Sequence, residues 1–174
     1  MNRSIRPFFL PLSLVAFLTL TGCAYRVGSV NTYGLHSIHV PVFKNKAFVA
    51  RVEEQVSNAV IRQFQIDGSV RIATADTAEA VLEGEIIAWE RRPLRFQRRD
   101  LIVTREFRLT VAAQITVRDR GGNIIVKRKR IEGETTYSTR SELGEDQVAA
   151  ERQAFPAAAD DLAKNIVEQV VEGW

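Results

Sequence analysis

Few residues in this sequence have the type and spacing that catalysis or metal binding requires. The only histidines are His36 and His39, and two residues three positions apart on a strand point to opposite faces. We therefore expect two separate histidines at a surface or sheet edge, not a shared metal site. Glu83 and Glu85 would lie about 7 Å apart on one face of a strand, a spacing that suits acid/base chemistry, but ordinary surface charge is the better interpretation.

The sequence also lacks the motifs that usually accompany a nucleophile, a phosphate group or a cofactor. It has no G-x-S-x-G, no glycine-rich loop between a strand and a helix, and no pair of cysteines. We therefore predict a protein that is not an enzyme and has no cofactor. No catalytic, cofactor-binding or metal-ligating residues are predicted.

The most distinctive group of charges is an arginine cluster that we expect at the turn between two long strands. Pro93, Leu94 and Phe96 interrupt it. Arginine forms paired hydrogen bonds with phosphate or carboxylate, and the apolar residues between the arginines are suited to acyl chains or a partner. A solvated loop with scattered charges explains the same pattern, so both interpretations stay open. The candidate anion contacts are Arg91, Arg92, Arg95, Arg98 and Arg99.

Cys23, the only cysteine, ends the segment Leu20-Thr21-Gly22-Cys23. This segment resembles the bacterial lipobox, which has a branched apolar residue, two small residues and an obligatory cysteine. The resemblance implies a diacylglycerol thioether on Cys23, cleavage after Gly22 and acylation of the new amino terminus. A single cysteine excludes an intramolecular disulfide, and acylation would protect the thiol in an oxidising compartment. Two or three acyl chains anchor a protein stably, at about 0.8 kcal/mol per buried CH₂.

The residues before Cys23 have the three parts of an export signal. Arg3 and Arg6 supply a positive start, and an apolar run from Phe8 to Leu20 follows. The run is shorter than the roughly 20 apolar residues that span a bilayer, so we expect residues 1–22 to be a lipoprotein signal peptide. Without them 24 − 2 = 22 basic residues face 21 acidic ones, a formal charge of +1. Near neutrality and export both argue against nucleic-acid binding.

The remaining 174 − 22 = 152 residues suit one domain with one core. Residues 23–35 are rich in Gly, Ser, Asn and Tyr without a period and predict a lipidated amino terminus and tether. A single α+β domain is then expected over 36–174. It begins with a strand over 36–43 that lies at or near a sheet edge, because Pro41 has no N–H to donate.

Helical and extended patterns alternate along this domain. Apolar residues from Val49 to Phe64 recur every three or four positions and predict a helix that ends at Asp67-Gly68. The strand at 103–118 alternates between apolar and polar residues, as in an antiparallel sheet covered on one side. The turn Arg120-Gly121-Gly122-Asn123 then predicts a hairpin. A short strand is expected at 70–73 and long strands at 80–92 and 124–137. In the strand at 80–92, Ile87 and Trp89 break the alternation, and the strand at 124–137 carries the basic run Lys127–Arg130.

The last segment is helical from Glu145 to the end of the chain. Pro156 lies within it and is expected to kink or split the helix. Two amphipathic helices on one face of a four- or five-stranded, mainly antiparallel sheet form a two-layer sandwich. This is the predicted fold class, α+β. The apolar stripe of the last helix consists of Val148, Phe155, Ala159, Leu162, Ile166 and Val170.

Several segments of the chain, in their order, resemble the LPS-assembly lipoprotein family LptE. The resemblance covers nearly all of the chain after residue 22. The matching segments are the lipobox, Val40-Pro41-Val42-Phe43-Lys44-Asn45, Ile61-Arg62-Gln63-Phe64, Ala80-Val81-Leu82-Glu83-Gly84-Glu85-Ile86, Arg105-Glu106-Phe107-Arg108-Leu109-Thr110, Gly133 to Tyr137, and Leu162-Ala163 with Ile166-Val167.

This resemblance implies a lipoprotein, not an enzyme, that plugs the outer-membrane β-barrel LptD and assists insertion of lipopolysaccharide into the outer leaflet. It also implies two helices against a four-stranded sheet. Ala24, and not Asp, follows the lipidated cysteine, so we expect sorting to the outer membrane, on its periplasmic side. The resemblance makes lipopolysaccharide the candidate ligand of the loop arginines, although these are not a fixed motif of the family. Pro156 departs from the family pattern. The alternative is a periplasm-facing lipoprotein that acts alone as an anionic-ligand-binding or scaffolding module.

Overall fold

The computed structural model describes residues 32–99, 102–139 and 145–173. The predicted signal peptide, Cys23 and most of the predicted tether lie outside these ranges. The described residues form eight elements along the chain. These are β1 (Ser37–His39), β2 (Lys44–Asn45), α2 (Val52–Asp67), β3 (Arg71–Ile72), β4 (Ala80–Arg99), β5 (Ile102–Asp119), β6 (Ile124–Thr139) and α3 (Glu145–Glu172).

All the strands belong to one mixed sheet in the order β3-β1-β4-β5-β6, and β2 also pairs with β4. The three long strands β4, β5 and β6 pair antiparallel with one another, whereas β1 and β2 run parallel to β4. This sheet has six strands instead of the four or five expected, because the predicted strand at 36–43 forms only the short β1 and a further strand, β2, follows it at Lys44–Asn45. Pro41 lies in the gap between them, where a residue without an N–H cannot continue a ladder.

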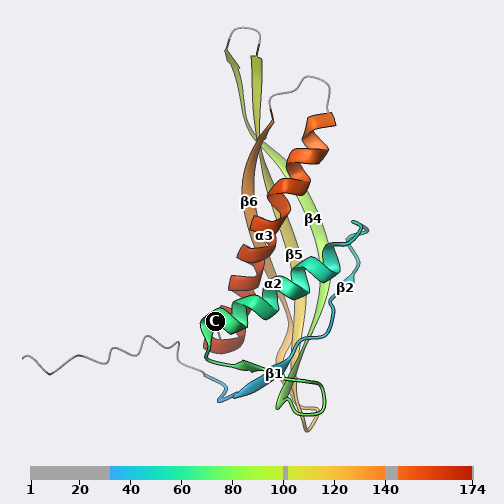
Figure 1. The fold of residues 1–174 in the computed structure, drawn as a ribbon, viewed down its shortest axis with the longest axis vertical. Coiled ribbons are helices and arrows are strands. Elements are labelled where there is room, and N and C mark those ends of the chain that lie inside the picture. Colours follow the sequence, from blue (N-terminus) through green and yellow to red (C-terminus); the bar gives the residue numbers. More distant parts are fainter. Residues whose placement is uncertain (1–31, 100–101, 140–144, 174) are drawn as a thin grey trace, which may run out of the picture.

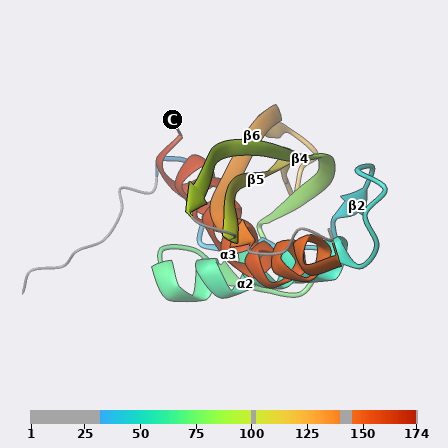
Figure 2. The same ribbon diagram turned by 90° about the horizontal axis from the view of Figure 1, so that it is seen from above.

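Both helices cover one face of this curved sheet, which confirms the predicted two-layer α+β arrangement. α3 packs on β5 and β6, and α2 lies beside α3 and contacts β2 and β3. The view from above shows the two helices on the same side of the strands (Figures 1 and 2). Within the described residues, the other face of the sheet carries no helix.

Alternation along β5 decides which face is covered. From Phe107 to Val117 every second side chain is buried, and Leu109, Val111 and Ile115 have no exposed surface. The residues between them, apart from the buried Ala112, are partly exposed. The prediction for this strand is confirmed, and its apolar face forms the floor on which the helices pack.

A β-bulge explains the two residues that break the alternation in β4. Ile86 pairs with Ala113, but Ala88 pairs with Ala112, so Ile87 is the extra residue of the bulge. The bulge reverses the facing of the residues that follow it, up to the second register shift between Pro93 and Arg95. Trp89 therefore returns to the covered face, where its ring packs 4.9 Å from that of Phe155 in α3.

The first helix begins three residues later than its apolar pattern suggested. Phe48 and Arg51 have φ values of 59° and 64°, which are left-handed and incompatible with a helix. The helix ends as predicted, because Gly68 adopts a φ of 72° and its N–H donates to the Phe64 carbonyl at 3.0 Å. Val56, Val60 and Phe64 are fully buried against the rest of the core.

The last helix runs unbroken through Pro156, so this proline does not split it. Pro156 is exposed, while Phe155 and Leu162 on either side of it along the apolar stripe are buried. Tertiary packing therefore holds the helix together across the one lost hydrogen bond. Val148 is 52% exposed and does not belong to the buried stripe, contrary to the prediction.

Candidate functional site

The arginine cluster lies on a strand and not in a loop. β4 continues to Arg99 and β5 begins at Ile102, so the strands are longer than predicted and all five arginines fall within β4. The paired ends of β4 and β5 extend past the first turn of α3 (Figure 1). A second register shift, between Pro93 and Arg95, occurs within the cluster.

Arg91 is bound to the last helix through Glu151. Its guanidinium donates to the Glu151 carboxylate at 2.9 Å, and the Glu151 side chain is only 15% exposed. Trp89 Nε1 and the Tyr137 hydroxyl, at 3.3 Å, donate to the same carboxylate. The hydrogen bond to Glu151 raises the pKa of Arg91, and burial followed by the charge of Glu151 raises the pKa of Tyr137 above its usual 10.0. Arg91 therefore joins sheet to helix.

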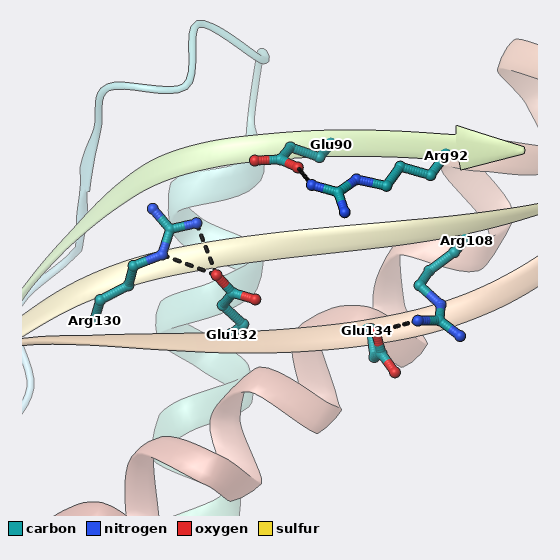
Figure 3. A network of polar contacts seen from close by, with 6 residues as sticks. All are labelled: Glu90, Arg92, Arg108, Arg130, Glu132 and Glu134. Atoms are coloured by element: carbon teal, nitrogen blue, oxygen red, sulfur yellow. Dashed lines mark hydrogen bonds and ion pairs between the residues drawn. The ribbon is translucent and has the colours of Figure 1, made fainter.

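Three ion pairs lie on the uncovered face of the sheet. Arg92 donates to Glu90 at 2.8 Å within β4. Figure 3 shows this pair beside two others on the face turned away from the helices. They are Arg108 with Glu134 at 3.5 Å and Arg130 with Glu132 at 2.7 Å. Three cations and three carboxylates thus compensate one another on this face.

The other three arginines occupy the end of the strand. The backbone of Arg95 pairs with Glu106, that of Arg98 with Val103, and that of Arg99 with Ile102. Their side chains lie outside the described part of the structure. Their assignment as anion contacts stays a prediction, and of the five candidates Arg91 and Arg92 already have carboxylate partners.

A groove of about 490 Å³ lies on the uncovered face, between the β2 segment and strands β4 and β5. The sequence did not suggest it, because its walls come from segments far apart in the chain. Four cations and two carboxylates line it, and each carboxylate is paired with a cation. Lys46 pairs with Glu85 at 2.7 Å and Arg118 with Glu83 at 3.6 Å, whereas Arg128 donates to the amide oxygen of the neutral Gln114 at 3.1 Å.

These pairs also decide the role of the two glutamates that the sequence suggested for acid/base chemistry. Glu83 and Glu85 each have a cationic partner in the groove. The hydrogen bond from Lys46 holds the pKa of Glu85 below its usual value, the opposite of what a general acid needs at neutral pH. The interpretation as ordinary surface charge fits this geometry.

The histidines likewise have separate partners. The backbone N–H of His36 donates to Glu79 at 2.9 Å, and its Nδ1 lies 3.3 Å from the same carboxylate. Nδ1 of His39 lies 3.3 Å from the carbonyl oxygen of Ala73. Across residues 32–99, 102–139 and 145–173 no three metal-binding side chains gather.

The basic run Lys127–Arg130 lies on β6, which is an edge strand of the sheet. All four side chains are exposed, and Arg128 has a left-handed φ of 43° at a register shift between β5 and β6. Charge and irregular backbone at an edge both oppose pairing with a strand of another molecule.

Neither helix in the described ranges is long and apolar enough to cross a bilayer.

Comparison with solved structures shows a fold shared with bacterial lipoproteins. A minor lipoprotein from Acinetobacter baumannii is 19% identical, with a TM-score of 0.50 over 80% of this chain and 92% of that one. The uncharacterized lipoprotein B from Nitrosomonas europaea is 13% identical, with a TM-score of 0.52 over 99% of this chain and 92% of that one. No curated protein matches this chain in sequence. The family model "LptE: Lipopolysaccharide-assembly" matches residues 35–172, and this chain therefore belongs to the LptE family.

Proposed function

We propose that this protein is the lipoprotein subunit of an LptD-type outer-membrane β-barrel, in which it forms the plug and assists insertion of lipopolysaccharide into the outer leaflet. The observation that carries the proposal is the family match over residues 35–172, which spans the whole described sheet and both helices. The family is a non-enzymatic one, and the carboxylates paired with cations in the groove agree with that.

The uncovered face of the sheet suits a position inside a barrel. Wide membrane barrels have polar interiors that are filled by water or by a plug. A plug must bring a polar surface to that interior without leaving charges desolvated and unpaired, because an isolated buried charge costs several kcal/mol. The ion pairs Arg92–Glu90, Arg108–Glu134 and Arg130–Glu132 meet this requirement within the face itself (Figure 3).

Lipid on Cys23 would attach the domain to the periplasmic side of the outer membrane. The described chain begins at Thr32, whose N–H donates to the Val171 carbonyl at 2.8 Å and whose hydroxyl donates to that of Glu172 at 2.9 Å. Thr32 is thus held beside the end of α3. An anchor on Cys23 would present this end of the domain toward the membrane.

Lipopolysaccharide contacts are proposed for Arg95, Arg98 and Arg99. Lipopolysaccharide carries phosphates on a sugar core next to acyl chains, so a binding site needs cations close to apolar groups. Leu94, at the register shift before these arginines, is 44% exposed. Arg91 and Arg92 were candidates too, but their carboxylate partners leave them less available to a ligand.

Two measurements test the proposal. Affinity-tagged full-length protein, extracted from cell envelopes in mild detergent, should co-purify with a large β-barrel subunit. The purified soluble domain should bind lipopolysaccharide, and replacement of Arg95, Arg98 and Arg99 by Ser should weaken that binding tenfold or more, or about 1.4 kcal/mol, with Tm unchanged. Lipopolysaccharide binding without a barrel would favour the lone periplasm-facing module, and unchanged affinity of the triple variant would remove the arginines from the site.

A further inference from the structure

Phe48 is the most unusual apolar residue on the described surface. It lies in the loop between β2 and α2 with 97% of its surface exposed, whereas Phe43 and Phe64 of the same region are buried. Single apolar residues at a surface are common. What distinguishes Phe48 is the way the chain holds it there.

The loop of residues 46–51, called here the Phe48 loop, is tied to both layers of the domain. Asn45 accepts a hydrogen bond from the Ala47 N–H at 3.1 Å and donates to the Val49 carbonyl at 2.6 Å and the Glu53 carboxylate at 2.9 Å. The Lys46 N–H donates to the Ile86 carbonyl in β4 at 2.8 Å. These bonds begin and end on a strand and a helix, so the loop has one defined shape.

The backbone of the Phe48 loop is strained at Phe48, the residue whose side chain it exposes. Phe48 has a φ of 59° and Arg51 a φ of 64°, and left-handed backbone is unfavourable for any residue with a Cβ and more so for a bulky aromatic one. Glycine would relieve the strain at either position. A strained backbone that projects a fully exposed ring lowers stability, and such strain is typical of sites that bind another molecule.

We propose that the Phe48 loop is a docking anchor whose phenyl ring enters an apolar pocket of a protein partner. The inference rests on the proposed function in one respect, because it takes the barrel subunit as that partner. A loop whose backbone already has a defined shape loses little backbone entropy on binding, and buried aromatic anchors dominate the energy of protein interfaces.

The charges around the loop favour a protein over a lipid surface. Three cations, Lys44, Lys46 and Arg51, are accompanied by three carboxylates, those of Glu53, Glu54 and Glu85. Lys46 is already paired with Glu85 at 2.7 Å. A balanced set gives little attraction to anionic headgroups, and fluid acyl chains accept a ring in any orientation, so they would not require a fixed loop.

The test compares Phe48→Ser with a matched control, Ile66→Ser, which removes a 76% exposed apolar side chain from α2. Binding of each purified lipidated protein to the purified barrel subunit is measured in detergent. Phe48→Ser should weaken binding about 30-fold, or about 2 kcal/mol at about 1.4 kcal/mol per decade. Ile66→Ser should bind like the unaltered protein.

A second variant separates binding from folding. Phe48→Gly should raise Tm by relieving the left-handed strain and yet weaken barrel binding as strongly as Phe48→Ser does. If unaltered protein does not bind the barrel, the proposed function fails. If it binds and both Phe48 variants bind equally well, the docking anchor fails. The remaining outcome is that both variants lose binding to vesicles of phosphatidylethanolamine and phosphatidylglycerol while keeping their affinity for the barrel. That result would mean that Phe48 enters the membrane and not the barrel subunit, and it would overturn the proposal.

Discussion

Replacement of Gly133 by Ala tests the packing of the two layers directly. Gly133 lies in β6 beneath α3, and a Cβ added there would lie 2.5 Å from both Cα and Cβ of Leu162 and still closer to its backbone nitrogen. Helix backbone cannot rotate away as a side chain can. The whole of α3 would have to move from the sheet, or β6 would have to bend.

The expected loss of stability is opposite to what the intrinsic strand preferences of Gly and Ala predict. Glycine inside a strand usually costs about 0.5–1 kcal/mol relative to Ala, so Ala would stabilise an open position. Overpacking a core costs about 1–3 kcal/mol and sometimes more, and contact with helix backbone belongs at the upper end of that range. We expect a net loss of about 2 kcal/mol, which lowers Tm by roughly 6–8 °C in a domain of this size.

The assay is thermal unfolding of the soluble domain, followed by circular dichroism. Gly121→Ala is the control, because the nearest atoms to its Cβ are the ends of the Asn123 and Asp119 side chains, both at 3.3 Å. We expect it to change stability by no more than about 0.5 kcal/mol. An unchanged or higher Tm for Gly133→Ala would mean that α3 does not rest on β6 at Leu162.

Three further predictions concern the core, the lipid anchor on Cys23, and the Glu151 cluster, which consists of Glu151 with Trp89, Arg91 and Tyr137. Leu109→Asp should unfold the domain, as measured in a thermal melt, because it places an unpaired charge at a position with 0% exposure. Thr110→Asp, on the uncovered face, should lower stability only slightly. The reverse order of the two melting temperatures would contradict the register of β5. Cys23→Ala should abolish labelling by a fatty-acid analogue and block signal cleavage, and equal labelling would exclude lipidation at this residue. Glu151→Gln should lower the pKa of Tyr137, measured by tyrosinate absorbance. The raised pKa of Tyr137 contributes stability that is fully present below pH 10.0, the ordinary pKa of tyrosine, and is lost as the pH rises through the pKa of Tyr137 in the folded protein. In the variant this loss of stability should therefore occur at a lower pH.

Regular elements of this fold were predictable because their burial follows a period. The apolar residues of α2 and the alternation of β5 each extend over many residues, and one-sided burial leaves a clear pattern in both. The bulge at Ile87 was not predictable, since a bulge adds one residue of ordinary strand type. The sequence showed it only as two apolar residues out of phase, Ile87 and Trp89.

The candidate site was predictable in residue type but not in pairing. Five arginines within nine residues suggested an anion site, yet the partner of Arg91 is Glu151, which lies 60 residues further along the chain. Nothing in the local sequence indicates a contact of that separation. Phe48 was equally hidden, because it lies directly before the apolar pattern of the predicted helix and no residue type around it indicates its left-handed backbone.

The Glu151 cluster and Pro156 are best understood together. Proline inside a helix removes a hydrogen bond and costs about 3 kcal/mol, so the part of α3 before Pro156 needs support from outside the helix. The bulge at Ile87 supplies it, because it turns Trp89 and Arg91 toward α3, where both donate to Glu151, and Trp89 also packs on Phe155. One extra residue in the sheet thus fixes the segment of the helix that the proline weakens.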